Sequence, residues 1–89
     1  MEKKQLQQLA EAVAVLDGRP AHPEDYKDDV FDIVMKVGFD TFKFRLQQIQ
    51  VKCLSQPSIV NGYISLLTYF RTGEYHDDYT NQLLFKATV

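Results

Sequence analysis

The sequence predicts an all-α protein, a compact bundle of four to five short helices that forms a single domain over residues 1–89. Apolar residues recur at the three- and four-residue spacing of a helix, and glycine and proline divide the chain into segments of helical length. In the middle of the chain, one helical stripe is formed by Phe42, Leu46, Ile49 and Cys53. The alternating pattern of a strand would scatter these four residues over both faces, so we reject a strand here.

The first two helices follow from their apolar stripes and from the residues at their ends. The first is expected over residues 3–16, with a stripe of Leu6, Leu9, Ala10, Val13 and Leu16. Asp17, Gly18 and Pro20 end it. The second begins near His22 or Pro23, because proline suits a first helical position and acids favour a helix N-terminus. Its apolar residues are Tyr26, Val30, Ile33, Val34 and Val37.

A tight corner at Gly38 connects the second helix to the third, which is expected over residues 41–54. Gly38 fits the C-terminal cap of the second helix, and Asp40 fits the N-cap of the third. Two neighbouring helices are therefore expected to meet with almost no loop between them.

A fourth helix is expected over residues 57–72, starting at Gln56 to Ser58 and ending near Gly73. It has no charged residue before Arg71, and Gly62 lies in its expected interior, where close packing would offset the cost of a glycine. We therefore expect it to be the central helix, buried by its own subunit or by a symmetry mate. The tail, residues 77–89, is expected to be a short fifth helix, with an edge strand at residues 83–85 as the alternative.

The net charge of −2 conceals a strong asymmetry along the chain. Residues 17–40 contain seven acids and three bases, a sum of −4, whereas residues 41–72 contain four bases and no acid, a sum of +4. Opposite the apolar stripe of the second helix lie four acids, Asp25, Asp28, Asp29 and Asp32. The simplest interpretation is a solvated face near the positive end of the helix dipole. The functional interpretation is an acidic patch that attracts a basic partner.

The third helix has a second apolar edge. A turn of about 100° per residue places Phe44 and Val51 nearly opposite the core stripe, beside Gln47 and Gln48. Either the helix is packed between layers of its own subunit, or this edge contacts a second molecule. The second interpretation is preferred, because a chain of 89 residues leaves little room for a fully enclosed helix. The expected partner-binding residues are Phe44, Arg45, Gln47, Gln48, Val51 and Lys52, an apolar centre with a polar border.

Motifs for catalysis, metals and cofactors are missing from the sequence. It contains no phosphate-binding glycine loop, nucleophile elbow, Cys-x-x-Cys pair or His-Glu-x-x-His motif, so we expect no enzyme, catalytic residue, metal or cofactor. His76, Asp77 and Asp78 are adjacent, but adjacent residues rarely converge on one ion, and helix capping is the preferred interpretation. Cys53 is expected to be a small buried apolar residue. The aromatic residues of 63–79 are expected to pack within the protein rather than to stack on nucleobases, because few lysine or arginine residues accompany them.

A cytoplasmic location is the expectation. A single cysteine cannot form an internal disulfide, and the N-terminus lacks the apolar segment of a signal peptide. The longest uncharged stretch, residues 55–70, is too short and too polar to cross a bilayer. No membrane contact is therefore predicted.

These observations together predict a non-enzymatic protein-binding module, a small regulator, adaptor or inhibitor that occupies the surface of a partner protein. Self-association through residues 41–54 and 57–72 is expected as well. The small size and the lack of active-site motifs suit an accessory protein of a phage or plasmid.

The alternative is a nucleic-acid-binding regulator of the helix-turn-helix type. It would use the corner at Gly38 and would read bases with the lysine, arginine and glutamine side chains of residues 41–54. Three features weaken it. Val34 stands where the motif needs a small residue, two aromatic residues crowd the second helix of the motif, and the acidic face would repel phosphate.

Overall fold

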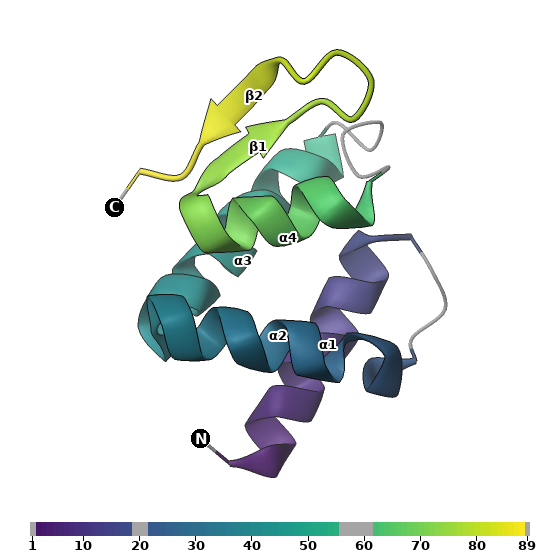
Figure 1. The fold of residues 1–89 in the computed structure, drawn as a ribbon, viewed down its shortest axis with the longest axis vertical. Coiled ribbons are helices and arrows are strands. Elements are labelled where there is room, and N and C mark those ends of the chain that lie inside the picture. The colour runs from purple at the N-terminus through teal and green to yellow at the C-terminus, as the bar shows by residue number, and fades with distance from the viewer. Residues whose placement is uncertain (1, 19–21, 56–61, 89) are drawn as a thin grey trace.

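The computed structural model describes residues 2–18, 22–55 and 62–88, and for residues 53–55 the backbone alone. Within these residues the chain forms four helices followed by an antiparallel hairpin (Figure 1). The elements are α1 (Lys3–Leu16), α2 (Pro23–Val37), α3 (Phe39–Ser55), α4 (Tyr63–Thr72), β1 (Glu74–His76) and β2 (Leu83–Lys86). The predicted helical bundle is confirmed, and the hairpin is added to it.

The first two helices begin and end as predicted and cross each other at a steep angle (Figure 1). The Tyr26 hydroxyl ties them together by donating a hydrogen bond to Asp17 Oδ2 at 3.0 Å. The apolar stripes meet between them and bury Leu6, Leu9, Ala10, Val13, Ala14, Tyr26, Val30, Ile33 and Val34. Burial of these side chains is the main force that holds the pair together.

The corner between α2 and α3 consists of Gly38 alone. Gly38 has φ +94° and ψ 151°, a conformation that side-chain-bearing residues rarely adopt. Its amide donates to the Val34 carbonyl at 2.8 Å, and its carbonyl accepts from the Phe42 amide at 3.0 Å. The predicted glycine cap is confirmed. The prediction that Asp40 is the N-cap is wrong, because α3 starts directly after Gly38 and Asp40 lies in its first turn.

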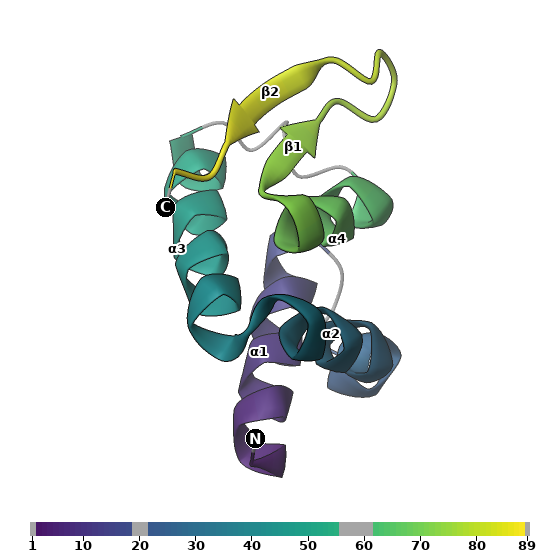
Figure 2. The same cartoon turned by 60° about the vertical axis from the view of Figure 1, so that its left-hand side comes forward.

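Whereas α2 and α3 each contact all three other helices, the fourth helix contacts α2, α3 and β1 (Figure 2). Its buried residues are Leu66, Leu67, Tyr69 and Phe70. The prediction that Gly62 lies inside the helix is wrong. Gly62 is the N-cap, with an extended backbone, and the Leu66 amide donates to its carbonyl at 3.0 Å. The predicted start at residues 56–58 lies outside the described residues.

The predicted fifth helix is wrong, and the alternative of a strand at residues 83–85 is right. The loop between the strands is closed by Asp77, whose carboxylate accepts hydrogen bonds from the amide and the hydroxyl of Thr80. Asn81 adopts the left-handed conformation, φ +58°, which turns the chain back. The rings of Tyr75 and Phe85 then stack at 5.4 Å, and both contact Tyr69 of α4. The contacts of Phe85 with Tyr75 and Tyr69 therefore favour a strand over a helix at this position.

Candidate interaction surfaces

The outer face of α3 carries the second apolar edge that the sequence predicts. On the inner side Phe42 and Ile49 are fully buried. On the opposite side Val51 has 68% of its surface exposed. Phe44 is half-buried, yet it belongs neither to the buried core nor to the described residues packed against that core. This edge of α3 therefore faces away from the interior of the protein.

The polar residues around this edge occupy different environments. Gln47 is exposed, whereas Gln48 is half-buried. Lys52 is exposed at the end of α3 that meets the hairpin, and its Nζ lies 5.8 Å from the centre of the Phe85 ring. We define the outer face of α3 as Phe44, Gln47, Gln48, Val51 and Lys52.

Arg45 differs from its predicted neighbours, because its side chain is directed at α4. Its Nη1 donates hydrogen bonds to the carbonyls of Phe70 and Arg71, both at 2.9 Å. These carbonyls belong to the last turn of α4, where a helix leaves acceptors unpaired and carries partial negative charge. Arg45 therefore caps α4 and does not border the outer face of α3, a correction to its predicted role. Local spacing cannot show this, because the acceptors lie about 25 residues further along the chain.

The acidic residues of α2 divide into two groups. Asp25, Asp28 and Asp32 are exposed, as expected of a helix face opposite the core. Asp29 is half-buried and accepts a hydrogen bond from the Tyr63 hydroxyl of α4. Asp29 therefore connects two helices, and the exposed acidic patch is smaller than predicted.

Two apolar residues on the outer side of α2 were not predicted as a site. Phe31 is 43% exposed and Met35 is 67% exposed. The signal was present in the sequence, because neither residue falls on the apolar stripe that packs into the core.

The geometry of the α2–α3 corner departs from a helix-turn-helix. That motif joins its helices by a turn of about three to four residues, whereas Gly38 alone separates α2 from α3. Of the side chains expected to read bases, Lys43, Gln47 and Gln50 are exposed. Arg45 is occupied at the end of α4.

A shallow hollow lies between the N-terminus of α4 and the hairpin loop. It is lined by residues that include Gly62, Ser65, Asp77, Asp78 and Asn81. Asp78 fills part of it, since its carboxylate accepts from the Ser65 hydroxyl and lies where a side chain at Gly62 would project. Asp77 is engaged with Thr80, so the carboxylates at 77 and 78 serve separate local contacts. His76 is directed at a different acid, and its Nε2 lies 3.9 Å from Glu74 Oε1.

The described residues contain no group of three or more histidine, cysteine, aspartate or glutamate side chains placed to hold a metal ion. The predicted burial of Cys53 concerns a side chain outside those described. Among the described helices, none is both long and apolar enough to cross a membrane.

No protein-family model, curated protein or solved structure matches the chain.

Proposed function

We propose that the protein is a non-enzymatic protein-binding module, a small regulator, adaptor or inhibitor that contacts its partner through the outer face of α3. The observation that carries the proposal is Val51. It is 68% exposed on a helix whose opposite side is fully buried, and it shares its face with Phe44, which lies outside the core. A helix that only covers a core needs no apolar residues on its outer side.

The composition of this face suits a protein partner. Protein interfaces commonly have an apolar centre and a polar rim that forms hydrogen bonds. Phe44 and Val51 supply apolar surface here, and Gln47, Gln48 and Lys52 supply amide and ammonium groups around it. Covering a valine or phenylalanine side chain completely is worth about 1.5–3 kcal/mol. Val51 is mostly exposed and Phe44 is half-buried, so each would gain only part of this amount when covered.

A second copy of the chain is the first partner that we propose. The helix predicted to share the self-association surface, α4, has Tyr69 buried beneath the aromatic residues of the hairpin. Asp78 also contacts Ser65 of α4. Hairpin residues of the same chain therefore cover part of the surface of α4 that a symmetry mate was expected to cover. Self-association is accordingly proposed through α3, packed against the same face of the second copy about a two-fold axis.

Sedimentation equilibrium of the wild type and of two matched variants tests this proposal. Val51→Asp places a charge in the proposed interface, whereas Val15→Asp places the same charge on α1 at a valine of almost equal exposure, 70%. We expect concentration-dependent association in the wild type and in Val15→Asp, and a monomer in Val51→Asp, with circular dichroism showing that all three fold. Association that survives in Val51→Asp, or a wild type that is monomeric at every concentration, would contradict the proposed pairing.

A further inference from the structure

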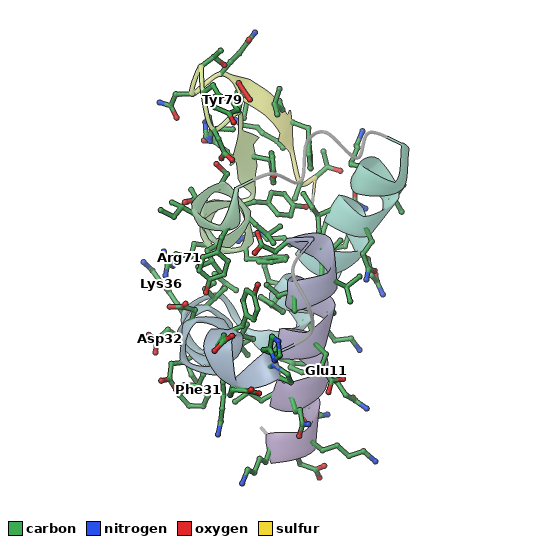
Figure 3. All side chains as sticks on the ribbon, turned by 90° about the vertical axis from the view of Figure 1, so that its right-hand side faces the viewer. Glu11, Phe31, Asp32, Lys36, Arg71 and Tyr79 are labelled. Atoms are coloured by element: carbon green, nitrogen blue, oxygen red, sulfur yellow. The ribbon has the colours of Figure 1, made fainter. Side chains whose placement is uncertain are left out.

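A pair of apolar side chains projects from the outer side of α2, away from α3. Phe31 and Met35 are four residues apart, so they lie one turn apart on the same side of the helix. They are 43% and 67% exposed, and Figure 3 shows Phe31 projecting outward from α2. The helix gains nothing for its own packing from the exposed part of these side chains.

Acids flank this apolar pair along the helix. Asp28 and Asp32 precede Phe31 and Met35 by three residues each, so each acid lies beside one apolar side chain. Together with Asp25 they are exposed, and none of the three forms an ion pair or a side-chain hydrogen bond within the described part of the chain. The five acids of α2 outnumber its two lysines, so the potential around the apolar pair is negative.

Basic residues lie near both ends of this surface. Lys36 of α2 and Arg71 of α4 project on the same side of the molecule as Asp32 (Figure 3). Lys27 lies towards α1, where it lines a small groove with Glu24 and Ala10. The surface thus carries three acids beside the apolar pair, with Lys27 one turn before Phe31 and Lys36 directly after Met35. We define the acid-flanked face as Asp25, Asp28, Phe31, Asp32 and Met35.

We propose that the acid-flanked face of α2 binds a basic amphipathic helix of a partner protein. Phe31 and Met35 would contact the apolar side of that helix, and Asp25, Asp28 and Asp32 would pair with its lysine or arginine residues. Charge complementarity selects a cationic partner, and it disfavours nucleic acid and anionic lipid surfaces. The partner segment is helical because the backbone groups of α2 are already paired within the helix. An extended segment would find no hydrogen-bond partners on this face, whereas a helix arrives with its own backbone paired.

Fluorescence anisotropy with a labelled synthetic peptide tests this inference. The probe is a peptide of about 18 residues, leucine and lysine patterned as an amphipathic helix, long enough to form a helix on its own. Its control has glutamate in place of lysine. We expect the lysine peptide to bind with an affinity that falls as salt rises, and the glutamate peptide not to bind.

Substitutions on the protein locate the binding. Met35→Lys should weaken binding of the lysine peptide about tenfold or more, because it replaces apolar contact by like charge. Asp28→Asn with Asp32→Asn should weaken it as well and reduce its salt dependence. The matched controls are Val15→Lys, which changes an exposed valine of α1, and the pair Glu2→Gln with Glu11→Gln, which changes the exposed N-cap acid of α1 and an exposed acid within that helix. They should bind as the wild type does.

Several outcomes would overturn the inference. They are a wild type that does not bind the lysine peptide, equal binding of the glutamate peptide, or controls that lose as much affinity as the face variants. Met35 is mostly exposed, so its replacement is expected to leave the fold intact, which thermal unfolding checks. The test does not depend on α3, since Val51→Asp should bind the peptide normally.

Discussion

Arg45 is a residue of α3 whose side chain holds the C-terminal end of α4. Its guanidinium donates to two carbonyls at the end of α4, where partial negative charge accumulates. It also packs against the helix cap, since a Cβ at Gly73 would lie 3.4 Å from Arg45 Nε. Gly73 itself has φ +82°, the left-handed conformation typical of a residue that ends a helix. Arg45 and Gly73 together fix the C-terminus of α4.

Replacing Arg45 by methionine should destabilise the protein. The substitution keeps most of the aliphatic stem and removes both hydrogen bonds to α4, and bonds from a charged donor contribute about 1.5–3 kcal/mol. We expect a loss at the lower end of that range, because the side chain is partly exposed to solvent. Urea unfolding measures the change.

Lys43→Met is the matched control for this substitution, because it removes a positive charge from the exposed side of the same helix. Lys43 lies 5.3 Å from the centre of the Phe39 ring, so its loss should cost no more than about 1 kcal/mol. Equal effects of the two substitutions would show that Arg45 acts through its charge alone, and not by capping α4.

The buried side of α3 was predictable at this scale, and the role of Arg45 was not. Phe42 and Ile49 are buried as their spacing predicts, because helical periodicity is a local property. Arg45 is three residues from Phe42 and lies at the margin of the same stripe. Whether a residue at that margin faces solvent or a helix end depends on where α4 lies. That is a long-range property, which a local pattern does not contain.

At the scale of the elements, the corner at Gly38 determines how α2 and α3 are placed. One residue has to satisfy the last turn of α2 and the first turn of α3, and it does so at φ +94° and ψ 151°. Apart from the neighbours Val37 and Phe39, no atom of the described residues lies within 4 Å of the position that a Cβ at Gly38 would occupy. The requirement for glycine is therefore conformational and not steric.

Gly38→Ala should accordingly lower the free energy of unfolding by about 1–3 kcal/mol, the range for a residue held in a sparsely populated backbone conformation. Thermal unfolding gives the value. The control is Gly18→Ala. Gly18 also has positive φ and open space at the position of a Cβ, but it does not join two helices directly. A Gly38→Ala variant with an unchanged free energy of unfolding would mean that the corner accommodates alanine without strain.

The hairpin shows why some elements are harder to predict than others. The apolar residues of the tail, Leu83, Leu84 and Phe85, are adjacent in sequence and fit a helix turn or a short strand equally well. The choice is made by Phe85, which meets Tyr75 across the hairpin and Tyr69 in α4. Helices α1 and α2, by contrast, carry caps and stripes within their own segments, and their bounds follow from the sequence.

At the scale of the whole molecule, α2 and α3 contact each other and are joined at Gly38, but they run in different directions (Figure 2), and their exposed sides carry different charges. The charge asymmetry of the sequence is thus an asymmetry in space. Of the two proposed surfaces, the acid-flanked face of α2 is negative, and the outer face of α3 carries Lys52 and no acid. The two proposed surfaces share no residue, so we predict that two partners can bind at once, which is the arrangement that an adaptor requires.

The same charge distribution leads us to expect no binding of nucleic acid. The single-residue corner differs from a helix-turn-helix, and exposed acids lie along the helix that would cross the phosphate backbone. Fluorescence anisotropy with a mixed-sequence DNA duplex and an RNA oligomer, at about 50 and 200 mM salt, is the measurement. Tight binding that weakens steeply with salt would contradict this expectation and would make Lys43, Gln47 and Gln50 the candidate contacts.

The most direct test of the account is to locate the surface that two copies share. Amide chemical shifts of isotope-labelled protein, recorded at high and at low concentration, report that surface residue by residue. We predict that the shifts that change on dilution cluster on the outer face of α3, at Phe44, Gln47, Gln48 and Val51, while those of α2 and the hairpin stay fixed. Shifts that stay constant everywhere, or that change only on another element, would contradict the claim that α3 is a protein-binding surface.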